Sequence, residues 1–405
     1  MKPICGSPAL RLDDLAIATG RPHFSELLHI GRPNVGSEEL LLERIRGMLR
    51  RRWFTNNGPL VLELEARLAH FLGVRHCILT SNATIALELA FRALELSGEV
   101  IVPSFTFVAT VHALQWIGVK PVFCDIAPGS HNLDPEHAAR LITPRTSAIV
   151  GVHLWGKACA HQRLAAIAAQ HRLRLVYDAS HAFACSTNGQ LIGSLGDCEI
   201  FSFHATKFFN TFEGGAITTA STELAQKLRL LRNFGFAGID QVVNLGINGK
   251  MSEICAAMGL TGLESLDEFI AANRRNYLIY RDRLAALPGL QLVRFDESER
   301  QNYQYVVIEI DEAATGLSRN DLLRILEAEN VLARRYFYPG CHRMEPYRTL
   351  YPDAGRELPR TEALTERVLV LPTGLAVSSR DAELICEIII AALRSPAECK
   401  HLLSR

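Results

Sequence analysis

The stretch Leu173-Arg174-Leu175-Val176-Tyr177-Asp178-Ala179-Ser180-His181 shows most directly how this chain folds. It begins as a short apolar run, typical of a buried strand, and continues at once into polar side chains. Similar runs rich in Val and Ile alternate with helical patterns around it, at residues 99–102, 121–124, 147–152, 173–177, 199–203 and 216–219. This alternation predicts an α/β fold with a mostly parallel sheet covered by helices on both faces.

Polar side chains follow two of the predicted strands. Asp178 directly follows one strand, and Thr84 comes soon after another, the apolar run at residues 77–80. In an open parallel sheet, ligands bind beyond the carboxyl ends of the strands. We therefore expect the functional site at this edge of the sheet.

Lys207 ends the segment Ser202-Phe203-His204-Ala205-Thr206-Lys207, and Glu213-Gly214-Gly215 follows shortly after. A lysine that forms a Schiff base with an aldehyde needs a neutral amine in a partly desolvated pocket, and a pyridine ring used as an electron sink needs a carboxylate beside its nitrogen. Alone, Lys207 would be a solvated surface residue and Asp178 a helix cap. Together with the Ser202 hydroxyl and a glycine pair that lets backbone approach a ligand, they predict pyridoxal 5'-phosphate as the cofactor.

A phosphate site is predicted at Ser81-Asn82-Ala83-Thr84, where an apolar strand leads into a helical pattern. Such a turn presents free backbone N–H groups and the positive end of the helix dipole to an anion. An ordinary helix cap would have the same composition. The presence of Lys207 and Asp178 favours the phosphate site.

Five separated segments resemble the DegT/DnrJ/EryC1/StrS family of sugar aminotransferases. They are Phe54-Thr55-Asn56-Asn57-Gly58-Pro59, Glu99-Val100-Ile101-Val102-Pro103-Ser104-Phe105-Thr106-Phe107, Asp178-Ala179-Ser180-His181, Ser202-Phe203-His204-Ala205-Thr206-Lys207 and Gly246-Ile247-Asn248-Gly249-Lys250-Met251. The resemblance extends from about Pro33 to about Pro372. It implies the pyridoxal-phosphate-dependent transferase fold type I, like that of aspartate aminotransferase. In that fold, a large domain with a mostly parallel seven-stranded sheet is joined to a smaller C-terminal α/β domain.

The resemblance also implies roles for individual residues. Lys207 matches the catalytic lysine that bonds to the cofactor and carries protons, and Asp178 matches the partner of the ring nitrogen. Phe107 matches the aromatic residue that stacks on the ring, and His181 matches a Gln/His position beside the cofactor. The phosphate-binding positions are matched by Thr84, Ile85 and Ser202, of which Ile85 offers only its backbone N–H.

Asn248 matches a residue that reaches the phosphate of the neighbouring subunit, so the resemblance implies a homodimer with composite active sites. A plain turn is the alternative, because Gly246, Asn248 and Gly249 all favour turns. The family more often has an aromatic residue and an arginine at the positions of Gly249 and Lys250. Because of this difference, the resemblance does not establish a direct ligand contact at either position. The form Asn-Gly-Lys-Met-Ser-Glu resembles the subgroup that aminates carbon 4 of a nucleotide-linked 4-keto-6-deoxyhexose.

Candidate substrate contacts lie in three segments. They are Thr55, Lys250, Arg334, Tyr336 and His342. Residues 334–342 resemble a late substrate loop of the family, in which arginine or tyrosine could meet a diphosphate or a sugar. Simple aromatic packing there, and a simple turn around Thr55, are equally compatible with the sequence.

These features together predict ping-pong transamination. The expected substrates are L-glutamate and dTDP-4-keto-6-deoxy-D-glucose, and the expected product is dTDP-4-amino-4,6-dideoxy-D-glucose. A 3-keto sugar nucleotide or a cyclic keto-alcohol would use the same cofactor residues and stays an alternative. A related branch has histidine in place of the lysine and dehydrates at carbon 3, so Lys207 argues against that reaction. A non-catalytic regulator that binds the cofactor or a nucleotide sugar is disfavoured by the intact Lys207, Asp178 and Ser202.

The composition excludes some partners. The chain has 405 residues, with 43 basic and 43 acidic side chains, so no net charge attracts it to nucleic acid or to a membrane surface. It has no apolar stretch of about 20 residues and no leader pattern, which predicts a cytoplasmic enzyme. Its ten cysteines contain no CxxC pair, and Cys159 and His161 resemble metal ligands only in their spacing. No metal site is predicted.

The predicted organisation has three parts: an N-terminal extension (1–32), a large pyridoxal-phosphate-binding domain (33–270) and a small C-terminal domain (271–405). One long helical pattern from Met251 to Leu287 bridges the two domains and is broken by Pro288-Gly289. A strand at residues 303–308 and a helix at residues 321–329 are expected beyond it.

Overall fold

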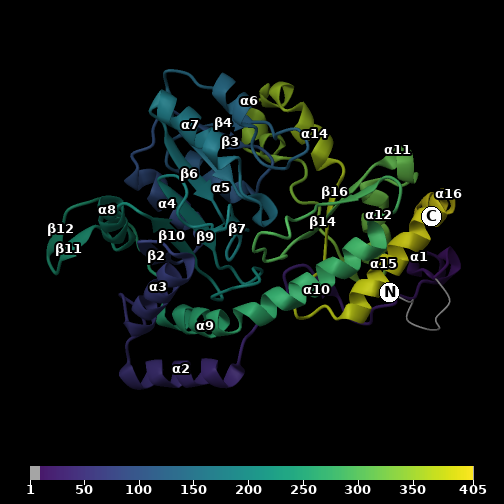
Figure 1. Cartoon of the computed structure of the whole chain (residues 1–405), viewed down its shortest axis with the longest axis horizontal. Helices are drawn as coiled ribbons and strands as arrows, with labels where there is room; N and C mark the ends of the chain where they lie inside the picture. The colour runs from purple at the N-terminus through teal and green to yellow at the C-terminus, as the bar shows by residue number, and fades with distance from the viewer. Residues whose placement is uncertain (1–9, 405) are drawn as a thin grey trace.

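A seven-stranded sheet forms the centre of the protein, whose computed structural model describes residues 10–404 (Figure 1). Its strands, in spatial order, are β2 (His76–Thr80), β10 (Gly215–Thr219), β9 (Cys198–Ser202), β6 (Arg174–Asp178), β5 (Thr146–Val152), β3 (Glu99–Pro103) and β4 (Lys120–Cys124). The five strands from β9 to β4 run parallel, and β10 runs antiparallel to both of its neighbours. The predicted α/β fold with a mostly parallel seven-stranded sheet is confirmed.

Helices cover both faces of this sheet, because the side chains on both faces of its strands are mainly apolar. One face packs against α4 (Ala83–Ala93), α5 (Val108–Trp116) and α8 (Thr222–Arg232). The other face packs against α3 (Pro59–Leu72) and α9 (Glu253–Glu264) at one end and against α6 (Pro135–Arg140) and α7 (His161–His171) at the other. Helix α2 (Glu38–Arg51) lies outside α9 and contributes Leu41 and Met48 to the same cluster.

Helix α10 (Leu266–Leu284) leads from the large sheet to a smaller unit (Figure 1). This unit has an antiparallel sheet of β13 (Leu290–Leu292), β14 (Val306–Ile310) and β16 (Val368–Leu371). It also includes α11 (Glu312–Thr315), α12 (Arg319–Ala328), α14 (Pro359–Thr365), α15 (Ser379–Arg394) and α16 (Pro396–Leu403). Its apolar core is continuous from Tyr277 on α10 to Cys399 on α16.

Two element predictions were wrong in detail. The single helix expected from Met251 to Leu287 is two helices, which meet at Ser265, where the backbone leaves helical geometry at φ −104 and ψ 9. The strand expected at 303–308 begins only at Val306, because Tyr303 has a left-handed backbone with φ 49. Tyr303 packs its ring against Tyr277 instead of extending the sheet.

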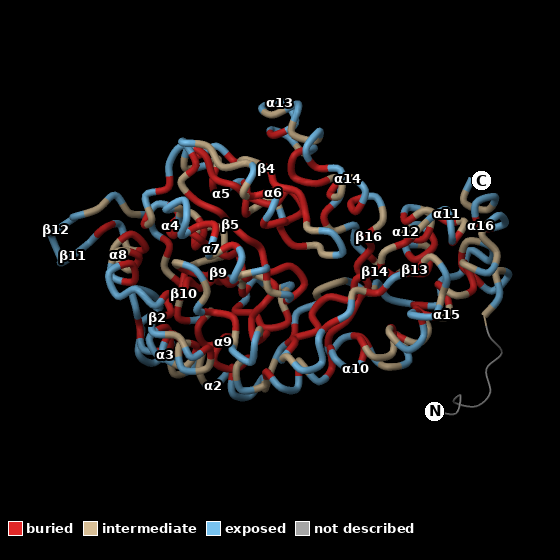
Figure 2. The backbone as a smooth tube through the Cα atoms, turned by 45° about the horizontal axis from the view of Figure 1, so that its top comes forward, coloured by how far each residue is buried: buried red, intermediate tan, exposed pale blue. Residues whose placement is uncertain are grey.

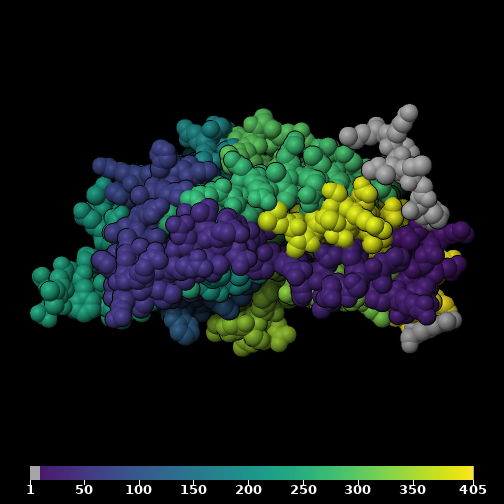
Figure 3. Space-filling model, turned by 90° about the horizontal axis from the view of Figure 1, so that it is seen from below, coloured from purple at the N-terminus to yellow at the C-terminus, as the bar shows by residue number. Residues whose placement is uncertain are grey.

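Both ends of the described chain meet in the smaller unit. Strand β1 (Leu28–His29) pairs with β15 (Val331–Leu332), and the backbone N–H of Ala16 on α1 (Ala16–Thr19) donates to the Glu329 carboxylate at 2.7 Å. Figure 3 shows this N-terminal segment, in purple, lying beside the yellow C-terminal segments. The segment after β15 then returns to the large sheet, where Tyr347 on α13 (Tyr347–Leu350) joins the α4 and α5 cluster.

A hairpin of β11 (Phe236–Gly238) and β12 (Gln241–Val242) projects from the large sheet beyond α8 (Figure 1) and is exposed along most of its length (Figure 2). Its surface is apolar: Ile239 is 93% exposed and Leu245 is 79% exposed. Other exposed apolar side chains in and beside the hairpin are Phe234, Phe236, Val242 and Val243. Within residues 10–404, no helix combines the length and the apolarity that crossing a membrane requires.

Candidate active site

The carboxyl ends of β2, β6 and β9 open into one cavity of about 570 Å³. Strand β6 ends in Asp178, β9 ends in Ser202, and β2 leads through Asn82 into helix α4. Because β10 runs antiparallel, its first residues also begin at this edge, and Lys207 lies in the connection between β9 and β10. Eight residues predicted for the site line this cavity: Thr84, Ile85, Phe107, Asp178, His181, Ser202, Lys207 and Tyr336.

Lys207 is held by a residue from the smaller unit. Its Nζ donates a hydrogen bond to the Tyr305 hydroxyl at 3.0 Å. Burial lowers the pKa of the Lys207 amine to about 8, against the opposing attraction of the Asp178 carboxylate. A lysine with this pKa is partly neutral near physiological pH, as a nucleophilic amine must be.

Asp178 is buried, and both of its carboxylate oxygens are oriented by neighbours. Oδ2 accepts from the Thr110 hydroxyl at 2.8 Å, and Oδ1 accepts from the Ser180 backbone N–H at 3.0 Å. Thr110 lies on α5, so the carboxylate is fixed by a helix as well as by its own strand end. This arrangement presents a positioned negative charge to the cavity that also contains Lys207.

His181 is neutral and its tautomer is defined. Its Nδ1 lies 3.3 Å from the backbone N–H of Trp155, which can only donate, so Nδ1 carries no proton. Burial, and then the charge of Lys207, hold the pKa of His181 well below its usual value. The Nε2 atom therefore carries the proton of this ring.

The first turn of α4 lies at one end of the cavity and is suited to binding an anion. The Asn82 side chain caps the helix by accepting from the Ile85 backbone N–H at 2.9 Å. The N–H groups of Ala83 and Thr84 begin the helix, where no earlier turn supplies an acceptor. A Cβ on Gly215 would lie 2.7 Å from the Ala83 nitrogen, so this glycine lets β10 pack closely on the helix start. Gly214 similarly faces Thr211 and Met251, so the glycine pair serves packing within the protein.

Aromatic side chains form another wall of the cavity. Phe107 is 56% exposed, unlike the neighbouring Phe105, and its ring lies 6.4 Å from that of Phe337. Phe337 in turn stacks on Tyr336 at 5.0 Å. An exposed ring at the mouth of such a cavity is suited to stacking on a planar ligand.

Five predicted site residues lie outside this cavity. Thr55 and Asn248 are exposed, and the Lys250 amine lies 4.6 Å from the Phe234 ring centre. Arg334 lines a neighbouring cavity of about 340 Å³, whose wall shares Phe107 and Tyr336 with the first. His342 is buried, with its ring nitrogens 2.6 Å from Ser104 and 2.6 Å from Glu362.

Three residues of the site were not predicted from the sequence. They are Thr110, Trp155 and Tyr305. Thr110 falls within a helical pattern, and Tyr305 falls within the strand expected at residues 303–308. Trp155 is preceded by a strand that ends at this edge, which was the one available signal.

The residues present fit pyridoxal phosphate. One cavity brings together a desolvated lysine amine, an oriented carboxylate, an exposed aromatic ring and a helix start whose first N–H groups have no acceptor in a preceding turn. These are the groups that an aldehyde, a pyridine nitrogen, a flat ring and a phosphate each require. Among residues 10–404, no group of three or more His, Cys, Asp and Glu side chains could hold a metal ion.

The chain is similar to known proteins. The chain matches the DegT/DnrJ/EryC1/StrS aminotransferase family over residues 36–390. It is 38% identical to a dTDP-4-amino-4,6-dideoxy-D-glucose transaminase from Shigella dysenteriae, over 91% of this chain and 98% of the relative. It is 35% identical to a GDP-perosamine synthase from Caulobacter vibrioides, over 84% of this chain and 91% of the relative.

Among solved structures, the protein is similar to DesI crystallised in the presence of its TDP-sugar product, with a TM-score of 0.92 and 48% identity over 97% of this chain and 100% of DesI. Fold, cavity and similarities together define a pyridoxal-phosphate-dependent aminotransferase. Within that class, the chain belongs to the DegT/DnrJ/EryC1/StrS aminotransferase family.

Proposed function

We propose that this enzyme transfers an amino group from L-glutamate to carbon 4 of dTDP-4-keto-6-deoxy-D-glucose and so forms dTDP-4-amino-4,6-dideoxy-D-glucose. The observation that carries the proposal is that one cavity is lined by both the Lys207 amine, whose pKa burial lowers, and the Asp178 carboxylate. The choice of sugar is supported by the Shigella dysenteriae transaminase and by DesI, which are named for or crystallised with such nucleotide sugars. A GDP-linked sugar is the competing substrate, since a similar relative is named for a GDP sugar.

When bound, pyridoxal phosphate supplies an aldehyde that takes up the amino group and a ring that accepts electrons from the reacting carbon. Lys207 would hold the aldehyde and then move the proton at the reacting carbon, for which its partly neutral amine is suited. Asp178 would face the ring nitrogen and stabilise its positive charge. Phe107 would cover one face of the ring, and His181 would lie beside it.

The phosphate of the cofactor would be held at the start of α4. Thr84 and Ser202 offer hydroxyls there, while the Ile85 N–H already donates to Asn82. To contact the phosphate directly, the Ile85 N–H would therefore have to donate to both Asn82 and the phosphate. Tyr305 keeps its proton, because burial raises its pKa well above the usual value, and it accepts from the Lys207 amine.

Product analysis tests the reaction. Purified enzyme with pyridoxal phosphate is incubated with L-glutamate and either a 4-keto or a 3-keto sugar nucleotide, and 2-oxoglutarate and the aminated sugar are followed by NMR. We expect nitrogen on carbon 4 with the dTDP-linked 4-keto sugar. Amination at carbon 3 alone would contradict the proposed substrate, and release of no 2-oxoglutarate with either sugar would contradict glutamate as the donor.

Lys207→Ala tests whether the protein is an enzyme at all. We expect turnover to fall by at least about 10³-fold, because the nucleophile and the proton carrier are removed together. A matched control is Lys157→Ala, an exposed lysine outside this cavity. Full biological activity of Lys207→Ala would favour a non-catalytic regulator.

We infer that two copies of the chain form a homodimer whose sites are composite. Support comes from the exposed apolar hairpin, since a patch of this kind is typical of an interface between proteins. Asn248 lies at the base of the hairpin, bridged to Asn233, and is exposed. Its neighbour Gly249 accepts from the Ser81 N–H of the same chain at 2.8 Å, so contact with the same chain's site is the competing arrangement.

Mixing two inactive variants separates these arrangements. Lys207→Ala and Asn248→Ala subunits are combined and allowed to exchange. If Asn248 serves the partner's site, each mixed dimer contains one intact site, and about a quarter of wild-type activity returns in an equal mixture. If Asn248 serves its own site, the mixture stays as inactive as its parents.

A further inference from the structure

Trp155 lines a second cavity of about 270 Å³, and its ring packs against His181 and Phe337, which line the active-site cavity. The second cavity is lined by Trp155, His131 and Glu309, among others, and lies between the large sheet and the smaller unit. Trp155 is only 1% exposed, and its backbone has φ 59 and ψ 13. A left-handed backbone is costly for a bulky residue and persists only where surrounding contacts hold it.

Toward the active site, Trp155 fixes His181. Its backbone N–H donates to His181 Nδ1 at 3.3 Å, and its ring stacks on the imidazole with centroids 5.5 Å apart. A second stacking partner is Phe337, also at 5.5 Å and almost parallel, and the Phe337 and His181 rings are themselves 6.1 Å apart. The orientation of His181 therefore depends on where Trp155 lies.

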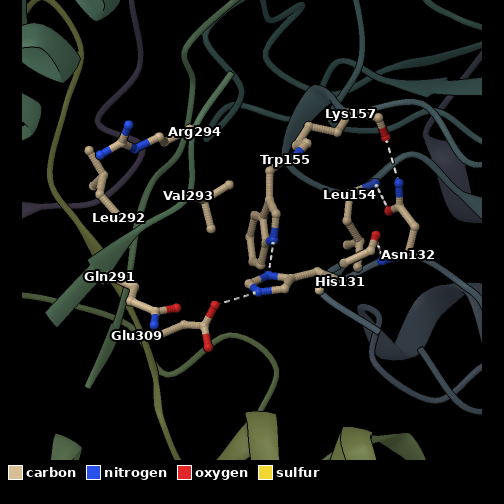
Figure 4. Close-up of a pocket in the computed structure, with 12 residues that line it drawn as sticks. His131, Asn132, Leu154, Trp155, Lys157, Gln291, Leu292, Val293, Arg294 and Glu309 are labelled. Carbon is tan, nitrogen blue, oxygen red and sulfur yellow. Dashed lines mark hydrogen bonds and ion pairs between the residues drawn. The ribbon is translucent and has the colours of Figure 1, made fainter. Parts of the chain in front are cut away.

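Toward the second cavity, Trp155 is held by His131. The indole N–H donates to His131 Nδ1 at 2.8 Å, and His131 Nε2 lies 3.1 Å from the Glu309 carboxylate. Figure 4 shows this chain from the indole through the imidazole to the carboxylate. Since an indole N–H can only donate, His131 Nδ1 is unprotonated, and the protonated Nε2 donates a hydrogen bond to the Glu309 carboxylate.

The three residues come from different parts of the fold. His131 follows β4, Trp155 follows β5, and Glu309 is on β14 of the smaller unit. The His131 imidazole accepts one hydrogen bond from Trp155 and donates one to Glu309. It therefore cannot turn without losing both hydrogen bonds. The indole is thereby fixed from the side opposite to the active site.

We propose that His131, which has no contact with the cofactor cavity, is a positioning residue for the aminotransferase reaction: anchored by Glu309, it holds Trp155 and thereby keeps His181 in place beside the cofactor. This inference rests on the proposed place of His181 in the site. Ordinary packing is the competing explanation, in which His131 supports stability alone.

The first test is His131→Phe, which keeps an aromatic ring and removes both hydrogen bonds. We expect the dissociation constant for pyridoxal phosphate to rise about tenfold and kcat to fall about tenfold, while KM for glutamate changes less than twofold. The control is His76→Phe, another half-buried histidine, whose Nε2 lies 3.0 Å from Thr222 at the far edge of the sheet. The control should leave all three constants within twofold of wild type.

A second readout needs no cofactor. Trp53 and Trp116 are exposed, whereas Trp155 is buried, so the fluorescence that acrylamide fails to quench comes from Trp155. We expect this protected emission to shift to shorter wavelength in His131→Phe, because the indole loses its acceptor. His131→Asn, whose amide oxygen can replace Nδ1, should recover most of the wild-type wavelength and cofactor affinity.

A double-mutant cycle decides whether His131 acts through Trp155. Trp155→Phe removes the indole N–H and keeps a ring against His181. If the proposal is correct, adding His131→Phe to Trp155→Phe changes cofactor affinity by less than about twofold, whereas independent effects would multiply. Multiplied losses, or a lowered melting temperature of His131→Phe with unchanged cofactor affinity and protected emission, would overturn the proposal. Failure of the proposed function would instead appear as absent glutamate turnover in the wild type, with cofactor affinity and emission still measurable.

Discussion

The ionisation of Lys207 gives the site a measurable pH dependence. Only the neutral amine attacks an aldehyde, and burial lowers the pKa of this amine to about 8. We expect the rate at which pyridoxal phosphate attaches to the cofactor-free protein to rise with pH and to be half-maximal near pH 8. Stopped-flow absorbance measures this rate, and a midpoint near the ordinary lysine value would contradict the proposed environment.

Asp178→Asn should move that midpoint to lower pH. The carboxylate raises the pKa of the Lys207 amine, so its removal lowers the pKa and makes the neutral form available in more acidic solution. Asp197→Asn is a suitable control, because Asp197 is paired with Arg174 at the opposite ends of the strands. An unchanged midpoint in Asp178→Asn would mean that the two groups do not interact.

Among single residues, the sequence predicted those whose side chains have a distinctive chemistry. It missed those that join the site only through tertiary contacts. Lys207 and Asp178 stood out because their side chains follow strand ends. Tyr305 bonds to a lysine 98 positions earlier in the chain, and Trp155 meets His181 through its backbone N–H and its stacked ring. Neither contact leaves a local pattern in the sequence.

A substitution at the N-terminal cap of helix α4 can change phosphate binding without changing the stability of the protein. Asn82→Asp keeps a good helix cap but adds a negative charge beside the proposed phosphate site. We expect the melting temperature of the cofactor-free protein to stay near the wild-type value and the dissociation constant for pyridoxal phosphate to rise at least about tenfold. Calorimetry and cofactor titration measure these two quantities.

The control for this change is Ser221→Asp on α8, where Ser221 caps a helix by accepting from the Leu224 N–H at 3.2 Å. It should alter neither quantity, because α8 starts away from the cavity. Asn82→Ala, by contrast, should destabilise the cofactor-free protein by about 1 kcal/mol. Equal cofactor affinity in Asn82→Asp and wild type would exclude a phosphate at this helix start.

Elements were predicted more accurately than their connections. The six expected strands of the sheet each lie within one residue of their observed bounds, because short apolar runs between helical patterns are unambiguous. The reversed direction of β10 could not be read from its sequence, since a buried strand has the same composition in either direction. The break at Ser265 has no proline to mark it, and the nearest glycine, Gly262, lies within α9.

For the whole molecule, the exposed hairpin predicts dependence on assembly. Ile239→Glu with Leu245→Glu should place charges in the proposed interface and yield a protein of half the mass by light scattering. Activity should fall at least about tenfold if the sites are composite. Leu350→Glu, at a half-exposed leucine on α13, is the control and should leave both mass and activity unchanged. A dimer that survives the double change would exclude the hairpin as its interface.

The bond between Lys207 and Tyr305 also has a consequence for how the protein is made. The amine belongs to the connection between β9 and β10, whereas its acceptor belongs to the smaller unit. A chain growing on the ribosome therefore exposes the lysine long before the tyrosine has been translated. We therefore expect the cofactor to be captured in its final geometry only after the second half of the chain has folded onto the first.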